Sequence, residues 1–158
     1  MCIRDREQQE LLNIVIVGGG ATGIEVAGIL SEMKKFVLPN DYPDMSSSLM
    51  HIYLIEAGPR LLAGMSEESS AHAEQFLREM GVNILLNKRV VDYRDHKVVL
   101  EDGTEIATRT FIWVSGVTGV TIGNLDASLI GRGGRIKVDS FNRVEGMNNV
   151  FALSLIHI

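Results

Sequence analysis

The segment NIVIVGGGATG, residues 13–23, constrains the fold of this chain more than any other stretch. Ile14 to Val17 are β-branched, which predicts a short strand buried on both faces, as in a parallel sheet. Glycines follow in the spacing G-x-G-x-x-G and lead into a helix, predicted from Ala21 to about Lys35. A strand, a glycine turn and a helix in this order begin a βαβ unit.

The glycine turn also predicts a site for the phosphates of a dinucleotide. Gly18 permits the tight turn, Gly20 lets the backbone approach a pyrophosphate, and Gly23 lets the helix pack closely on the strand. The start of the helix adds free N–H groups and the positive end of its dipole. We therefore expect Gly18, Gly19, Gly20, Thr22 and Gly23 to contact the cofactor. The alternative is a glycine-rich turn that binds no ligand.

The next part of the chain alternates between helix and strand. Residues 38–48 carry prolines and polar turn formers, which predicts a loop. Residues 50–58 and 82–87 predict two further strands of the parallel sheet. Between them, a second helix is predicted to begin after a capping box at Ser66 and to end at Gly81.

The pattern then changes to short β-rich runs separated by turns. Residues 88–108 predict an antiparallel three-stranded meander, and residues 110–116 predict a strand that rejoins the parallel sheet. We expect short edge strands within 131–140 and 148–152. The predicted fold class is therefore α/β: a Rossmann-like, doubly wound parallel sheet with a three-stranded antiparallel β-meander crossover.

Glu56 and Ala57 stand where the second strand ends, a position that faces the adenosine ribose in dinucleotide-binding folds. An acid there accepts hydrogen bonds from the ribose hydroxyls and repels a 2′-phosphate, which favours NADH over NADPH. Arg60 is an argument for NADPH instead, because an arginine near this position can bind a 2′-phosphate. The alternative for Glu56 is a solvated carboxylate at a strand end.

Three further residues have predicted places in or near the site. Glu25, in the early turns of the first helix, either compensates the helix dipole or faces the nicotinamide or a neighbouring cofactor. Gly116 ends a strand on the edge that lines the ligand crevice, so a cofactor could lie close to its backbone. We expect Trp113 to belong to the core. No residue is assigned a catalytic role.

Composition narrows the class of partner. The net charge is −5 without a basic cluster on one predicted face, which argues against nucleic-acid binding. Residues 14–30 form the longest weakly charged run, but glycines and Glu25 make it a poor membrane span. Cys2 is the only cysteine, so neither an internal disulfide nor a CxxC pair is expected. The histidines, among them the predicted surface residues His72 and His96, lack metal-ligand spacing.

Several motifs together resemble a known family. NIVIVGGGATGIEVAG, LIEAGPRLL, DGTEI with TFIWVSGV, and GRGGRIKVD with NNVFA occur in this order between Leu12 and Ala152. The succession resembles the NAD-binding domain of the pyridine nucleotide-disulfide oxidoreductase superfamily. Within it, the similarity is greatest to type II NADH dehydrogenases, the single-subunit NADH:quinone oxidoreductases.

This resemblance implies roles for the predicted site residues. Gly18, Gly20 and Gly23 would hold the NADH pyrophosphate, and Glu56 the adenosine ribose. Glu25 would lie near the contact between nicotinamide and flavin. Gly116 would lie beside the bound nucleotide, although such enzymes usually carry AAG where this chain has Val114-Ser115-Gly116.

The resemblance also implies an enzyme larger than this chain. The NAD-binding domain is normally inserted in an FAD-binding domain, and NADH passes a hydride to FAD, which reduces a quinone. The whole protein would lie on the cytoplasmic side of the inner membrane as a peripheral protein, whereas the fragment would be soluble and inactive. The resemblance leaves open whether the whole protein forms a homodimer. The alternatives are another FAD- and NAD(P)H-dependent oxidoreductase of the superfamily, and a non-catalytic nucleotide-binding or redox-sensing module.

The two ends of the chain differ from the family pattern. MCIRDR and LSLIHI can be encoded by the two strands of one DNA sequence, which resembles a transposon end used in sequencing libraries. We therefore expect residues 1–6 and 153–158 to be cloning or sequencing scars that leave an NAD(H)-binding domain at 7–152. On this interpretation Cys2 is not native, and the apolar tail is no membrane anchor.

Overall fold

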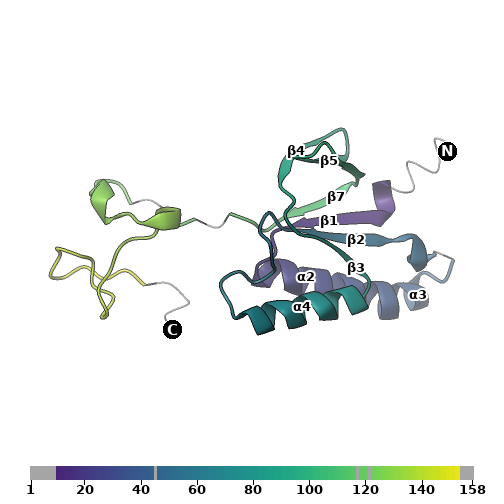
Figure 1. The fold of residues 1–158 in the computed structure, drawn as a ribbon, viewed down its shortest axis with the longest axis horizontal. Coiled ribbons are helices and arrows are strands. Elements are labelled where there is room, and N and C mark those ends of the chain that lie inside the picture. The colour runs from purple at the N-terminus through teal and green to yellow at the C-terminus, as the bar shows by residue number, and fades with distance from the viewer. Residues whose placement is uncertain (1–9, 45, 117, 121, 154–158) are drawn as a thin grey trace. The chain divides into compact units, whose positions relative to one another are not determined.

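The computed structural model describes residues 10–44, 46–116, 118–120 and 122–153, and the chain divides into two compact units between Ser115 and Gly116 (Figure 1). The expectation for the chain ends lies outside the described residues, apart from Leu153. Among the residues that are described, no helix is long and apolar enough to cross a membrane.

A four-stranded parallel sheet forms the centre of the first unit. Its strands lie in the order β3 (Val82–Leu85), β2 (His51–Ile55), β1 (Asn13–Val17) and β7 (Thr110–Trp113). All residues of β1 are buried, as its β-branched sequence predicts. The last residue of β1 pairs with the last residues of both neighbouring strands, so three carboxyl ends meet at one edge of the sheet.

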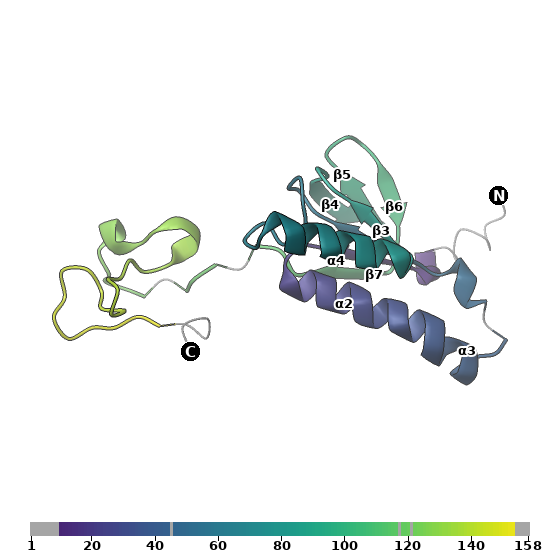
Figure 2. The same ribbon diagram turned by 60° about the horizontal axis from the view of Figure 1, so that its bottom comes forward.

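Helices cover one face of this sheet (Figures 1 and 2). α2 (Ala21–Glu32) and α4 (Glu67–Glu79) pack on apolar side chains such as Ile16 and Leu54. Ser66 caps α4 by accepting a hydrogen bond from the backbone N–H of Ser69, which confirms the predicted N-cap.

The predicted loop at 38–48 is wrong at its start. The helix runs on from α2 through a π-helical turn, η1 (Met33–Val37), into α3 (Leu38–Asp41). Pro39 lies in the first turn of α3, directly after the π-helical turn, where the regular i→i−4 hydrogen-bond pattern is already interrupted, so its missing N–H does not break the run. A short 3₁₀ turn, η2 (Ser47–Leu49), then leads to β2.

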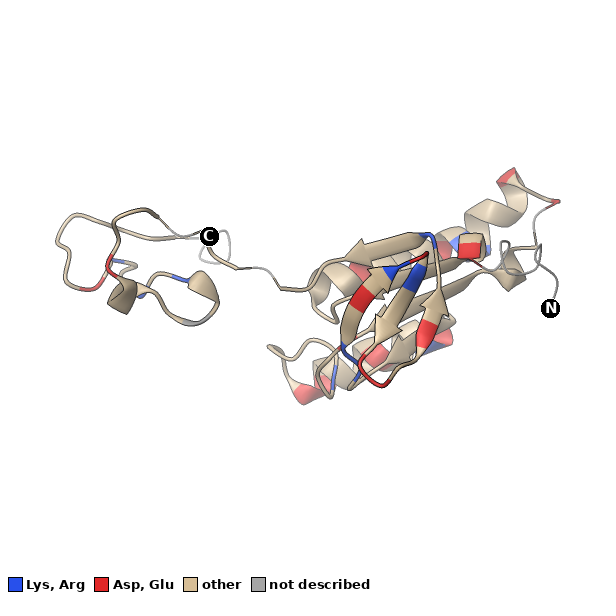
Figure 3. Ribbon diagram, turned by 90° about the horizontal axis from the view of Figure 1, so that it is seen from above, with Lys and Arg blue, Asp and Glu red and all other residues tan. Residues whose placement is uncertain are grey.

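The predicted antiparallel meander covers the other face of the sheet. It consists of β4 (Val90–Arg94), β5 (Lys97–Leu100) and β6 (Glu105–Ala107), in that order. Val98 and Leu100 of the meander pack against Val15, Val17 and Ile55 of the parallel sheet. Figure 3 shows basic and acidic residues interspersed on the outer side of the meander, where Lys97 pairs with Glu105 at 2.6 Å. The sheet is therefore enclosed between helices on one face and the meander on the other.

In its described residues, the second unit contains turns rather than strands. It holds two 3₁₀ segments, η3 (Ala127–Leu129) and η4 (Arg132–Gly134), and isolated antiparallel bridges. The edge strands expected within 131–140 and 148–152 are therefore wrong, since these segments contribute only single bridge residues. Gly133 and Gly134 both have positive φ, at 72° and 70°, and turn the chain where a strand was expected.

Candidate functional site

The glycine turn between β1 and α2 is closely packed on its strand side. Gly18 has φ of +119°, and its N–H donates to the carbonyl of Ile55 at 2.9 Å. A Cβ on Gly18 would lie 3.0 Å from the backbone nitrogen of Ser115. A Cβ on Gly23 would lie 1.9 Å from the carbonyl oxygen of Gly18. Both positions therefore require glycine for packing, and Gly18 requires it also for its conformation.

Gly20, in contrast, is open. It is the N-cap residue of α2, has an extended backbone, and supplies no side-chain cap for the helix. No atom lies within 4 Å of a Cβ built on it. The first turn of α2 carries no acidic residue, so the N–H groups there have no carboxylate from that turn to bind. An anion is the kind of group that such an uncapped helix start attracts.

Glu56 is held against the glycine turn by two backbone hydrogen bonds. Its Oε2 accepts from the N–H of Gly19 at 2.6 Å, and its Oε1 accepts from the N–H of Gly58 at 2.7 Å. The side chain thereby links the loop after β2 to the turn after β1. Each carboxylate oxygen still has a second lone pair, so Glu56 can accept further hydrogen bonds.

The loop after Glu56 packs beneath the same turn. Leu61 is fully buried, and its Cδ2 would lie 2.7 Å from a Cβ on Gly19. The N–H of Leu62 donates to the carbonyl of Gly19 at 2.8 Å. Gly58 and Leu61 are the site residues that sequence reasoning missed. The sequence offers one signal for Gly58, namely a glycine two positions after the acidic residue at the strand end.

Arg60 is engaged inside its own loop. Its guanidinium donates to the carbonyls of Ala63 at 2.9 Å, Met65 at 3.1 Å and Ser66 at 3.4 Å. In this conformation its N–H groups close the turn that leads into α4. Binding a 2′-phosphate would require them to leave these carbonyls.

The remaining predicted residues are distributed around the turn. Thr22, Glu25 and Ala57 are exposed. Gly116, with φ of +79°, begins the second unit, and its predicted place beside a nucleotide stays a prediction. Trp113 is 54% exposed, so its predicted place in the core is wrong. His72 and His96 lie on the surface, as predicted.

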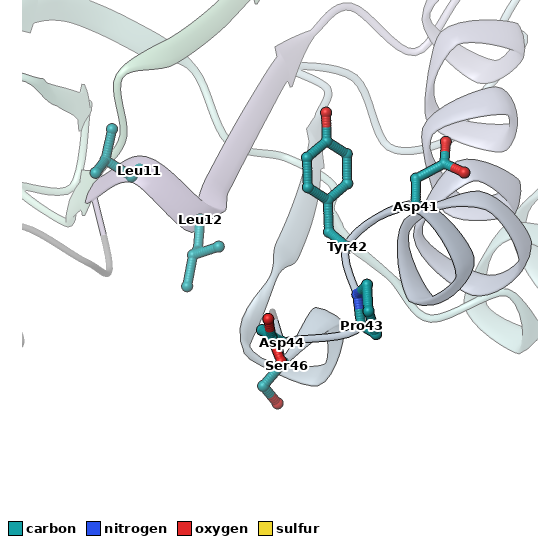
Figure 4. Close-up of a pocket in the computed structure, with 7 residues that line it drawn as sticks. All are labelled: Leu11, Leu12, Asp41, Tyr42, Pro43, Asp44 and Ser46. Carbon is teal, nitrogen blue, oxygen red and sulfur yellow. The ribbon is translucent and has the colours of Figure 1, made fainter.

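A pocket lies elsewhere in the first unit. It encloses about 700 Å³ beside Leu11 and Leu12, which precede β1, and its other wall is formed by Asp41 to Asp44 and by Ser46 (Figure 4). This is the end of β1 opposite to the glycine turn. Within the described ranges, no group of three His, Cys, Asp or Glu side chains could hold a metal ion.

Known proteins are similar to this chain in sequence and in fold. The family model described as "Pyridine nucleotide-disulphide oxidoreductase" matches residues 2–154. A type II NADH:quinone oxidoreductase of Haemophilus influenzae is 36% identical over 111 residues, 70% of this chain and 25% of that protein. The type II NADH:quinone oxidoreductase NdhA of Mycobacterium tuberculosis is 31% identical over 156 residues, 93% of this chain and 33% of that protein.

A solved structure adds a likeness in fold alone. NDH2 from Plasmodium falciparum, in complex with NADH, superposes with a TM-score of 0.68 at 24% identity, over 73% of this chain and 24% of that one. The chain therefore spans about a quarter to a third of the length of these relatives.

Proposed function

The chain belongs to the pyridine nucleotide-disulphide oxidoreductase family, and on that premise we propose that its glycine turn and Glu56 bind NADH. The observation that carries this proposal is the position of Glu56. Its carboxylate is fixed against Gly19 at the edge where the carboxyl ends of β1 and β2 meet. That edge is where open α/β sheets bind their ligands.

The turn suits a pyrophosphate because it combines close packing below with open backbone above. Gly23 brings the start of α2 down onto Gly18, and Gly18 lets the backbone of Ser115 approach; a side chain at either position would push these segments apart. Gly20 leaves the uncapped end of the helix accessible. Backbone N–H groups and the helix dipole would then neutralise the phosphate charge.

The ribose contact favours NADH over NADPH. Glu56 keeps free lone pairs for ribose hydroxyls, and its negative charge would repel a 2′-phosphate. Arg60, the residue that could have offset this repulsion, donates to three carbonyls of its own loop. When bound, NADH would supply a hydride, and this chain's residues would hold and orient it.

The whole protein, on this proposal, is an NADH:quinone oxidoreductase that uses FAD. The names of the relatives from Haemophilus influenzae and Mycobacterium tuberculosis support the activity. Glu25, exposed on α2 close to the glycine turn, would face the nicotinamide and flavin. Attachment to the cytoplasmic side of the inner membrane and a homodimer belong to the same proposal, as does a native domain limited to residues 7–152.

The direct test is a calorimetric titration of the chain with NADH and with NADPH. We expect at least about tenfold tighter binding of NADH, and a loss of most of that preference in Glu56→Gln, because charge repulsion is removed. Glu32→Gln, at an exposed position at the end of α2, is the matched control and should bind like the unaltered chain. Equal affinity for both nucleotides would contradict the role of Glu56. A folded chain that binds neither would contradict the site itself.

The same material tests whether the chain alone is active. Because it spans about a quarter to a third of the relatives named above, we expect no flavin-dependent oxidation of NADH at enzyme-like rates when FAD and a soluble quinone are added. Loss of absorbance at 340 nm measures the reaction. Sustained turnover would show that the proposed division into binding domain and missing flavin domain is wrong.

A further inference from the structure

Trp113 is the only tryptophan of the chain, and its exposure needs an explanation. It is the last residue of β7, and its indole Nε1–H donates to the carbonyl of Ser115 at 2.9 Å. Its ring meets Phe111 edge-on, with centroids 6.0 Å apart, and Phe111 in turn stacks on Tyr93 at 4.7 Å. The indole is therefore held in one orientation by its hydrogen bond to Ser115 and by Phe111, which Tyr93 supports from its other side.

The carbonyl that Trp113 holds belongs to a segment in contact with the glycine turn. The N–H of Val114 donates to the carbonyl of Val17 at 3.0 Å, which continues the pairing of β7 with β1. Ser115 follows, and its backbone nitrogen and Cα would lie 3.0 and 3.1 Å from a Cβ on Gly18. The indole hydrogen bond therefore fixes the backbone that forms one wall of the turn.

The sheet order puts this wall on the side of the turn opposite to Glu56. β1 lies between β2, which leads to Glu56, and β7, which leads to Ser115. The chain first moves from β1 to β2 and later returns to β7 on the other side, so the strand order reverses at β1. Dinucleotides bind across the crevice at such a switch point. With the adenosine ribose on Glu56 and the pyrophosphate over the glycines, the nicotinamide half extends toward β7.

We propose that Trp113 is a positioning residue for the nicotinamide half of the nucleotide, acting through the carbonyl and backbone of Ser115. This inference rests on the proposed NADH site. It predicts that Trp113 affects ligands that contain nicotinamide and leaves the adenosine half alone. Glu56, on the other side of the turn, affects both kinds of ligand.

The test compares NADH with ADP-ribose, which has the adenosine and both phosphates but no nicotinamide. Trp113→Phe keeps an aromatic ring and removes the N–H, so the carbonyl of Ser115 loses its donor. We expect the dissociation constant for NADH to rise about five- to tenfold, the range for one lost hydrogen bond, while that for ADP-ribose stays within about twofold. Ile112→Val, on the same strand but packed against the core on the helical face, keeps both the indole and Phe111 and serves as the control for general loosening of the strand.

Two outcomes of this titration would overturn the role proposed for Trp113. An equal loss of affinity for both ligands in Trp113→Phe would show a purely structural role, and no loss for either would show none; both overturn the inference. If the unaltered chain is folded and binds neither ligand, the proposed function fails first.

A measurement on the unaltered chain avoids the variant altogether. NADH, which absorbs where tryptophan emits, should quench the emission of Trp113 on binding, whereas ADP-ribose should leave it within a few per cent. NADH binding detected by calorimetry without quenching would place the nicotinamide away from β7 and overturn the inference.

Discussion

The two units of the chain are held together in different ways. In the first unit, a parallel sheet is enclosed on both faces, and residues such as Ile16 and Leu54 are fully buried. In the second unit, Val144 is the only buried apolar residue among those described, and Phe141 is 76% exposed. Its turns are fixed instead by glycines and by carboxylates that accept backbone N–H groups. A packed core therefore positions the glycine turn of the candidate site, whereas the second unit depends on local hydrogen bonds.

The largest effect should come from breaking the packed turn of the first unit. Gly23→Ala would place a Cβ 1.9 Å from the carbonyl of Gly18, so we expect a loss of more than about 3 kcal/mol of stability and of NADH binding. Gly28→Ala is the control on the same helix, because no atom lies within 4 Å of its Cβ. It should stabilise the chain by about 0.5–1 kcal/mol. Urea unfolding followed by Trp113 emission measures both, and equal effects of the two changes would show that the turn is not closely packed.

The second prediction separates the cores of the two units. Leu54→Ala removes a fully buried side chain from the sheet and should cost about 2–5 kcal/mol in the unfolding that Trp113 reports. Val144→Ala removes the buried apolar residue of the second unit and should leave that transition unchanged. Amide exchange by NMR would locate each loss of protection. A shift of the Trp113 transition by Val144→Ala would show that the two units unfold together.

Much of the first unit could be predicted from the sequence because its signals are local. The β-branched run before Gly18 predicts β1, and the alternation in 88–108 predicts the meander that the structure contains. Glu56 could be placed at a strand end in the same way. Its hydrogen bond to Gly19 could not be predicted, because it joins residues 37 positions apart and depends on how two loops fold together.

The predictions that were wrong rest on local sequence patterns whose outcome depends on tertiary contacts. The β-branched residues of 131–140 predict strands, but the second unit offers them only single bridges. Pro39 predicts a break, but it falls in the first turn of α3, where proline is tolerated. Trp113 predicts burial by its apolar surface, but its hydrogen bond to Ser115 holds it at the sheet edge.

The third prediction concerns a neutral cap in the first unit. Ser66→Ala removes the acceptor for the N–H of Ser69 at the start of α4 and should cost about 1 kcal/mol, independent of pH. Ser46→Ala is the matched control, since Ser46 precedes η2 without a side-chain cap bond and should change stability by less than about 0.5 kcal/mol. Thermal unfolding at pH 4 and pH 7 measures both. A cost of Ser66→Ala that varies with pH would show that a titrating group shares this cap.

The smallest effect should come from acid, and it should be local to turns in which a carboxylate accepts backbone N–H groups, such as those of the second unit. The backbone N–H groups of Arg143 and Phe141 hold the pKa of Asp139 below its ordinary value of 3.8, and that of Ser128 does the same for Asp126. A carboxylate with a lowered pKa stabilises the folded form at pH values above its ordinary pKa. That contribution is lost as the pH falls from about 4 through the lowered value.

We therefore expect the amides of Phe141 and Arg143 to lose exchange protection on acidification, while those of buried β1 keep theirs. Asp139→Ala should show the same loss of protection at neutral pH. NMR titration of the Asp139 carboxyl checks the cause directly. In the first unit, Asp102 forms a similar turn with Lys88 and Thr104, and its pKa is also lowered, so acid should loosen that hairpin locally. If β1 loses protection at the same pH as Asp139 protonates, the core and the charged turns form one cooperative structure, and the contrast between the two units is wrong.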